Sequence, residues 1–275
     1  MKRKVYHPKP GVSVTGMAYI DLWNQQWADK KLCSSGSVYK SEEWEVLTSF
    51  ELLKKQRVLE AGCGYGRWLK ALYDREIRVH GIDFAINGLR IVKEAIPEIP
   101  VVQGDIRHLP YKDDCFDLIL SWGVMEHFEN TNEIDAALEK AFGCLSESGL
   151  LVITVPYMSL NRLLNPLVVS RRLASRVNWI RKVFGKGEKV FFQYEFGVGY
   201  FRKKLISNKF CIKHEQFFWL EMGLRDDFRF LYPLVKYPVF LFSRIRGLDR
   251  LIRWVFAPFM LFVCEKAAQG NIIGE

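Results

Sequence analysis

Strands and helices are expected to alternate between residues 57 and 156, and this alternation constrains the fold more than any other feature. Apolar runs typical of strands occupy residues 57–61, 77–82, 101–104, 116–122 and 149–156. Amphipathic stretches typical of helices occupy residues 67–75, 86–95 and 132–145, the last with Asn132 as its expected N-cap. Because helices separate most of these strands, the strands are expected to pair in parallel. The sequence therefore predicts an α/β fold with a doubly wound, mostly parallel sheet.

The segments on either side of this region add further predicted elements. Residues 15–54 are expected to be mainly helical, and Tyr19, Trp23 and Trp27 share a face because they are four residues apart. Such an aromatic stripe packs in a core more often than it lines a ligand site. Beyond residue 156, the pattern predicts a helix at 199–210 and strands at 211–220 and 259–267.

A glycine-rich turn, VLEAGCGYG at residues 58–66, follows the first predicted strand of the sheet. Such a turn suits a nicotinamide dinucleotide, a nucleoside triphosphate or S-adenosylmethionine, because backbone N–H groups and a helix N-terminus face the ligand. The dinucleotide pattern G-x-G-x-x-G fails, since its sixth position, counted with Gly62 as the first, is Arg67, and the chain has no phosphate-loop pattern. Glu60, two residues before Gly62, favours the cationic S-adenosylmethionine over a pyrophosphate.

Two further acids follow successive predicted strands. Asp83 ends the second strand, where a carboxylate suits both ribose hydroxyls, and Phe84 beside it suits stacking on adenine. Asp105 follows the third strand and is expected to accept from the adenine amino group, with Ile106 packed on the ring. An acid at a strand end is often only a cap, but three of them around glycines form a specific pattern.

The runs VLEAGCGYG, GIDFA and GDIRHLPYKDDCFDLILSWGVMEHF resemble class I S-adenosylmethionine-dependent methyltransferases, in particular the small-molecule (methyltransferase type 11-like) group. The resemblance covers residues 57–156, with weaker likeness near the two last predicted strands. It implies a seven-stranded Rossmann-like sheet with helical insertions before the last two strands. It also implies S-adenosylmethionine as the cofactor, bound at Glu60, Gly62, Gly64, Gly66, Asp83, Asp105 and the backbone of Ser121 and Trp122; Phe84 and Ile106 complete the ten expected positions.

On this resemblance the chain is expected to be a single methyltransferase domain over residues 1–275. Its expected parts are an N-terminal helical lid at 1–54, the cofactor-binding core at 57–156, a basic insertion at 157–198, a helix and strand at 199–220, a basic amphipathic insertion at 221–256 and a closing strand at 257–266.

The expected reaction is an in-line displacement at an activated methyl group, which mainly needs alignment and removal of a proton. His127 is the best candidate base, because it follows the strand that carries Trp122; the alternative is a structural histidine. The E-x-x-E-H metal pattern of a related methyltransferase type is incomplete here, since Gly123 occupies its first position, so no metal is expected. Tyr157 is a second candidate for lining an acceptor site, although a core tyrosine is the commoner case.

Positive charge gathers in two segments. Residues 157–190 hold eight basic side chains against one acid, and residues 222–258 hold seven against three, in a chain of net charge +9. Residues 239–256 and 171–184 have amphipathic helical patterns, which suit ordinary surface helices or a peripheral contact with an anionic membrane. The hypothesis is a lid that meets a small-molecule or lipid-linked acceptor, methylated on O or C more readily than N.

Other interpretations stay open at the level of sequence. A non-catalytic scaffold that binds S-adenosylmethionine and a methyltransferase acting on a soluble glycan or nucleic acid are the alternatives. Nucleic acid is disfavoured because residues 121–124 read SWGV where amino-methylating nucleic-acid enzymes have an NPPY-type motif. The six scattered cysteines and the longest apolar run, the 11 residues from Trp254 to Cys264, predict a cytoplasmic protein without a membrane-spanning helix.

Overall fold

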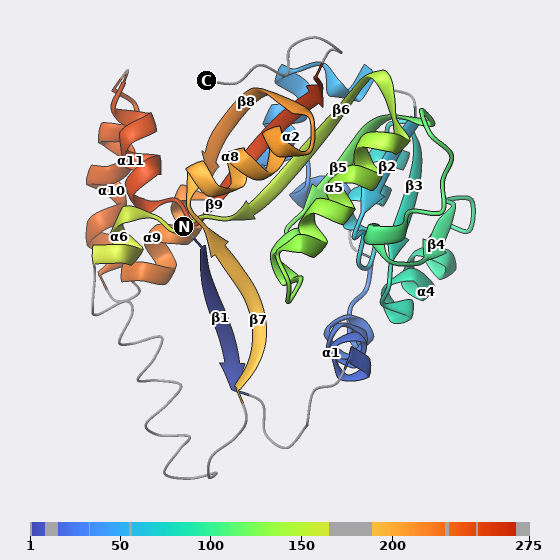
Figure 1. Ribbon diagram of the computed structural model, residues 1–275. Coiled ribbons are helices and arrows are strands. Elements are labelled where there is room, and N and C mark those ends of the chain that lie inside the picture. Colours follow the sequence, from blue (N-terminus) through green and yellow to red (C-terminus); the bar gives the residue numbers. More distant parts are fainter. Residues whose placement is uncertain are drawn as a thin grey trace. The chain divides into compact units, whose positions relative to one another are not determined.

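A computed structural model describes residues 2–8, 16–32, 34–54, 57–164, 189–228, 231–245 and 247–267 (Figure 1). The chain forms two compact units. One comprises residues 1–13, 155–201 and 215–261, and the other comprises residues 14–154, 202–214 and 262–275. The second unit contains every residue predicted to bind the cofactor and is called the sheet unit below; the first is called the insertion unit.

A seven-stranded sheet has the strand order β4-β3-β2-β5-β6-β9-β8. Its strands are β2 (Arg57–Ala61), β3 (Arg78–Asp83), β4 (Val101–Gln103), β5 (Phe116–Trp122), β6 (Leu145–Pro156), β8 (Phe210–Phe218) and β9 (Phe259–Lys266). The pairs β2–β3, β2–β5, β3–β4 and β5–β6 are parallel, whereas β9 runs opposite to β6 (Figure 1). The predicted α/β class, with its doubly wound, mostly parallel sheet of seven strands, is confirmed.

The helices of the sheet unit start and end close to where the sequence predicts. They are α1 (Gly16–Ala28), α2 (Glu42–Ser49), α3 (Arg67–Tyr73), α4 (Ile86–Ala95), α5 (Asn132–Cys144) and the short 3₁₀ turns η1 (Ser35–Ser37), η2 (Leu52–Lys54), η3 (Ile106–His108) and η4 (Met125–His127). The N-cap of α5 is Thr131 rather than Asn132. Asn132 instead begins the helix, and its N–H donates to Oδ1 of Asn130 at 3.0 Å.

Strand burial explains why this sheet forms the core. Val58, Leu59 and Ala61 of β2 are at most 4% exposed, and Leu118 and Leu120 of β5 are fully buried. Central strands of a parallel sheet are covered on both faces, so they need continuous apolar runs rather than alternating ones. The runs RVLEA and FDLILSW satisfy this requirement and form β2 and β5 without any shift of bounds.

The insertion unit contains a small antiparallel sheet that the sequence did not predict. Strand β1 (Lys2–Pro8) pairs with β7 (Lys189–Phe196), Lys2 lying opposite Phe196. The segment 157–198 was expected to be a helical insertion, but it contains strand β7. The sequence did not indicate this strand, because its partner β1 lies at the far N-terminal end of the chain. The helix expected at 171–184 lies outside the described residues.

The helices of the insertion unit are α6 (Leu160–Leu164), α8 (Val198–Ser207), which continues into the sheet unit, α9 (Leu220–Phe228), α10 (Tyr232–Ser243) and α11 (Leu248–Phe256). The prediction of a single amphipathic helix over residues 239–256 is wrong, because α10 ends at Ser243 and α11 begins at Leu248. Gly247 has φ of +93°, a left-handed conformation, and is the N-cap of α11. Within the described ranges, no helix is long and apolar enough to cross a membrane.

Gly223 allows α9 and α11 to approach closely and gives a test of the packing. A Cβ at this position would lie 2.2 Å from the carbonyl oxygen of Phe256, a backbone atom that cannot rotate away. Gly223→Ala is therefore expected to cost about 1–3 kcal/mol of unfolding free energy, measured by urea denaturation. Gly199→Ala is the control, since nothing lies within 4 Å of that Cβ; helix propensity should make it neutral or stabilising by up to ~1 kcal/mol. Equal effects of the two changes would contradict this packing.

Candidate functional site

The turn between β2 and α3 contains three glycines with left-handed backbones. Gly62, Gly64 and Gly66 have φ of +85°, +54° and +79°, which residues with a Cβ rarely adopt. A Cβ on Gly62 would lie 2.4 Å from Val124, and one on Gly66 would lie 2.3 Å from Val92. The turn thus presents backbone without side chains at the carboxyl end of β2, as a closely approaching ligand requires.

Asp83, the last residue of β3, holds this turn in place. One carboxylate oxygen accepts a hydrogen bond from the Gly64 N–H at 2.7 Å, and the other accepts from the Ala85 N–H at 2.8 Å. Burial raises the pKa of Asp83, and these backbone hydrogen bonds oppose the rise. Each carboxylate oxygen has a second lone pair, so Asp83 can shape the turn and still accept from ligand hydroxyls.

Glu60 is a buried acid at the same edge of the sheet. Its side chain lies in β2 and is 3% exposed, and its Oε2 has no hydrogen-bond partner among the described residues. Burial raises the pKa of Glu60 well above its ordinary range, although the charge of Arg67 counteracts this. The hydroxyl oxygen of Ser121, fully buried in β5, is also without a partner in the described part of the chain. Buried polar atoms of this kind are rare unless a ligand or water satisfies them.

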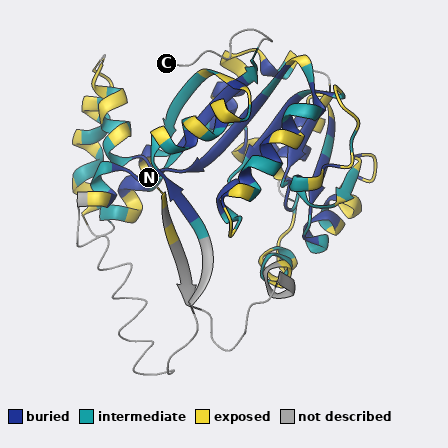
Figure 2. Ribbon diagram, viewed as in Figure 1, coloured by how far each residue is buried: buried dark blue, intermediate teal, exposed yellow. Residues whose placement is uncertain are grey.

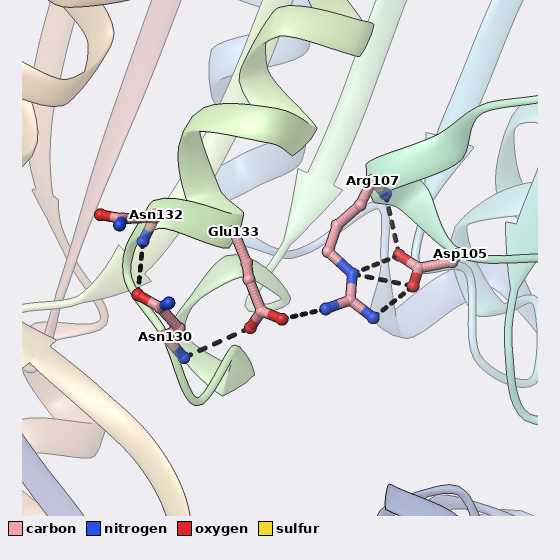
Figure 3. A network of polar contacts seen from close by, with 5 residues as sticks. All are labelled: Asp105, Arg107, Asn130, Asn132 and Glu133. Atoms are coloured by element: carbon pink, nitrogen blue, oxygen red, sulfur yellow. Dashed lines mark hydrogen bonds and ion pairs between the residues drawn. The ribbon is translucent and has the colours of Figure 1, made fainter.

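Asp105 is held by a neighbour that the sequence reasoning did not consider (Figure 3). The Nε of Arg107 donates to both carboxylate oxygens at 2.9 and 2.8 Å, and Arg107 also pairs with Glu133 of α5. Glu133 in turn accepts from the Asn130 N–H at 3.3 Å. Burial raises the pKa of Asp105, but the hydrogen bonds and charge of Arg107 outweigh it and keep the pKa below its ordinary value. Any ligand donor would share the carboxylate with Arg107, while Ile106 is buried beside it.

His127 and Glu126 lie in η4, the turn after β5. The imidazole Nε2 is 3.9 Å from Oε1 of Glu126, and the edge of the Trp23 ring packs against the imidazole with centroids 4.8 Å apart. Glu126 is 1% exposed, and burial raises its pKa from 4.5 to about 8. At neutral pH this acid therefore stays largely protonated beside the imidazole.

Helix α1 packs over the glycine turn. A Cβ on Gly64 would lie 3.1 Å from the Trp27 ring, and Trp27 also contacts Tyr65 with centroids 5.3 Å apart. Asn24 accepts from the Asn87 N–H at 3.2 Å, which joins α1 to α4. Trp23 and Trp27 were expected to pack in a core. Instead, Trp23 contacts His127 and Trp27 contacts the glycine turn at Gly64. The Tyr19 side chain lies outside the described residues.

Trp122 and Phe84 occupy the two remaining predicted positions. Trp122 stacks on Trp68 with centroids 4.8 Å apart and an interplanar angle of 26°, and its Nε1 has no partner among the residues described. Phe84 is half-buried directly after Asp83, and its carbonyl accepts from Nε2 of Gln103 at 3.2 Å. All ten predicted cofactor residues thus lie at or beside the carboxyl ends of β2, β3, β4 and β5.

Tyr157 lies in the insertion unit and is 4% exposed. Its ring contacts Phe217 with centroids 4.8 Å apart, and its N–H donates to the Pro258 carbonyl at 2.7 Å. Burial raises the pKa of Tyr157 to about 12, although a hydrogen bond with Trp254 opposes this. The structure places Tyr157 in the core of its unit.

Sequence reasoning missed Arg107, Glu133 and the site-facing role of α1. The Asp-x-Arg spacing of residues 105–107 was a usable signal, because an arginine two residues after a turn aspartate can fold back onto it. No comparable signal existed for Asn24 or Trp27, since their partners are more than 30 residues away. Within the described stretches, no group of three or more His, Cys, Asp or Glu side chains has the geometry of a metal site.

Residues 58–149 match the protein family described as "Methyltransferase domain". Among curated proteins, a demethylmenaquinone methyltransferase of Renibacterium salmoninarum is 28% identical over 120 residues, which is 42% of this chain and 49% of that protein. The chain thus spans about half the length of this relative.

Solved structures resemble the chain over more of its length. A protein from Pyrococcus horikoshii superposes with a TM-score of 0.58 at 17% identity, covering 93% of this chain and 100% of that one. An S-adenosylmethionine-dependent methyltransferase from Mesorhizobium loti gives a TM-score of 0.54 at 19% identity, covering 82% of this chain and 99% of that one. These likenesses show a common fold.

The buried carboxyl of Glu126 predicts a pH-dependent stability. Folding favours its protonated form, so its contribution is complete below pH 4.5 and is lost as pH rises through about 8. Glu126→Gln keeps the shape without ionising and should gain stability relative to the natural chain, on the order of 3 kcal/mol by alkaline pH. Thermal melts from about pH 4 to about pH 9 measure this difference, because the loss accumulates between the ordinary pKa of 4.5 and the raised pKa of about 8. The exposed Glu147→Gln serves as control; parallel pH profiles for all three proteins would contradict the burial of Glu126.

Proposed function

We propose that this chain, a class I S-adenosylmethionine-dependent methyltransferase by its domain and fold, transfers a methyl group to a small-molecule or lipid-linked acceptor. The observation that carries the proposal is the juxtaposition of buried Glu60, the left-handed glycine turn and Asp83 at one sheet edge. An acid beside a bare turn suits a cationic ligand with ribose hydroxyls and repels a pyrophosphate. The match of residues 58–149 to a methyltransferase domain supports the same conclusion.

The residues at this edge fit S-adenosylmethionine. Glu60 has an orphan carboxylate oxygen in need of a donor, which an ammonium group supplies. Asp83 has lone pairs left for ribose hydroxyls after it has accepted from Gly64 and Ala85. Phe84 and Ile106 offer apolar surface for the adenine ring, and Trp27 covers the turn from α1.

The bound cofactor supplies a methyl carbon activated by a sulfonium. The chain then has to align an acceptor, exclude water and remove one proton. We assign proton removal to His127, because it lies in η4, shortly after β5, and Oε1 of Glu126 is 3.9 Å from its Nε2. His127 then holds the proton taken from the acceptor, and the nearby oxygen of the Glu126 carboxyl can stabilise the imidazolium that forms.

The acceptor is proposed to react through oxygen or carbon. Such acceptors need a base, and His127 is available for it, whereas the SWGV sequence at residues 121–124 lacks the motif of amino-methylating nucleic-acid enzymes. The demethylmenaquinone methyltransferase among the relatives also supports a small-molecule acceptor. Turnover of S-adenosylmethionine with a panel of phenols, quinones and lipid-linked alcohols, read by mass spectrometry, tests the proposal.

Asp83→Asn should weaken binding of S-adenosylmethionine and its demethylated product about tenfold or more. The reason is that charge-assisted hydrogen bonds, each worth about 1.5–3 kcal/mol, become neutral ones. Calorimetry measures the affinity, and a thermal melt checks that the variant folds. Asp113→Asn is the control, because this exposed acid precedes β5 and so lies at the opposite edge. Equal affinity in both variants would remove Asp83 from the site.

His127→Ala should lower turnover by roughly 10²–10⁴ while cofactor affinity changes little, as expected when a general base is lost. His108→Ala, which removes an exposed imidazole from the neighbouring turn, should leave turnover unchanged. Rates are compared at saturating cofactor. A folded His127→Ala protein with the natural rate would show that alignment alone is sufficient and that His127 is not the base.

A further inference from the structure

The largest gathering of exposed apolar side chains lies on α10 and α11 of the insertion unit. Nine of the fourteen large apolar residues that are exposed in the described structure fall between residues 231 and 254. They are Leu231, Leu234, Tyr237, Leu241, Phe242, Ile245, Leu248, Leu251 and Trp254. Neither helix buries a single residue, and Figure 2 shows both only in the exposed and intermediate colours. Single exposed apolar residues are ordinary, but a patch of this size marks an interaction surface.

These residues share one face of each helix. In α10 the spacing of Leu234, Tyr237 and Leu241 is three and four residues, which places them in one row. Leu248, Leu251 and Trp254 repeat the three-residue spacing along α11. Leu234 is 73% exposed and Tyr237 is 71% exposed, values that side chains of a folded core never reach. The two rows therefore present apolar surface outward.

Basic side chains border the same rows. Arg244 directly follows α10, and Arg250 precedes Trp254 by four residues, one turn along α11, where its guanidinium also lies 3.5 Å from Glu215. The ammonium of Lys236 lies 4.7 Å from the Tyr237 ring centre. The acid of this segment, Asp249, is already paired with Arg253 at 2.9 Å. The border of the apolar face is therefore positive.

We propose that the α10–α11 face is a docking surface for the interface of an anionic lipid bilayer. Tyrosine and tryptophan favour the boundary between headgroups and acyl chains. Arginine and lysine at the border can extend their charges to anionic headgroups while their stems stay on apolar surface. Helices of 12 and 9 residues are too short to span a bilayer and lie in its surface plane instead.

This inference stands apart from the proposed function, because lipid binding by α10–α11 does not depend on methyl transfer. Docking through α10–α11 would also bring the protein to the membrane surface where a lipid-linked acceptor lies. The positive border distinguishes lipid from a second copy of the chain, since two such faces would bring like charges together.

The experiment is co-sedimentation of the full chain with vesicles of phosphatidylcholine alone or mixed with phosphatidylglycerol, at low and high salt. The natural protein should bind the anionic vesicles, bind neutral ones more weakly and dissociate as salt increases. The double change Leu234→Gln with Leu241→Gln should reduce partitioning at least tenfold. Arg244→Gln and Arg250→Gln should each reduce it about fivefold on anionic vesicles only.

Matched controls on α8 keep the result specific. Ile206 is 61% exposed, close to the 64% of Leu241, so Ile206→Gln removes an equally exposed apolar residue elsewhere. Lys203→Gln does the same for an exposed charge. No binding to anionic vesicles at low salt would overturn the proposal, as would equal losses in the α8 controls. A dimer by light scattering that Leu241→Gln converts to a monomer, without vesicle binding, would assign the face to a second copy instead.

Discussion

The hydrogen bond from the Gly64 N–H to the Asp83 carboxylate connects the ends of β2 and β3, and the candidate site depends on it. At 2.7 Å between a backbone donor and a carboxylate, it belongs to the class of charged hydrogen bonds worth about 1.5–3 kcal/mol. The N–H groups of Gly62 and Cys63 add bonds to the Ile82 carbonyl at 2.8 and 3.0 Å. The glycine turn is thereby fixed to the strand that carries the acid, and ligand contacts from both strands have one defined geometry.

Around this connection the chain buries acids that do not help it fold. Burial raises the pKa of Glu60 and Glu126, so their ionised forms are disfavoured in the free protein. Such groups gather where a ligand or a reaction needs them. Glu60 lies before the glycine turn, where a cationic ligand would supply its missing hydrogen-bond donor. Glu126 lies beside His127 in the turn after β5.

The sheet could be predicted from sequence because its information is local. The runs RVLEA and FDLILSW are mostly apolar, and central buried strands accommodate such runs. Strand β1 could not be predicted, because KRKVYHP shows no alternation of apolar and polar residues. Its partner is also distant in sequence, since it pairs with β7, which begins at Lys189. The break at Gly247 was visible as a glycine, but its left-handed φ is a property of the tertiary structure. Glu60 and Asp83 lie close enough that the charge of Asp83 helps to raise the pKa of Glu60, whereas the hydrogen bonds from Arg107 to Asp105 needed side-chain coordinates.

The central claim is that one ligand satisfies the acids of β2 and β3 together. A crystal structure of the chain with S-adenosylhomocysteine measures this most directly. We expect the ligand at the glycine turn, with its ribose hydroxyls within hydrogen-bond distance of Asp83 and its ammonium on the side of Glu60. Ligand density elsewhere on the chain, or at the turn with neither acid in contact, would contradict the account.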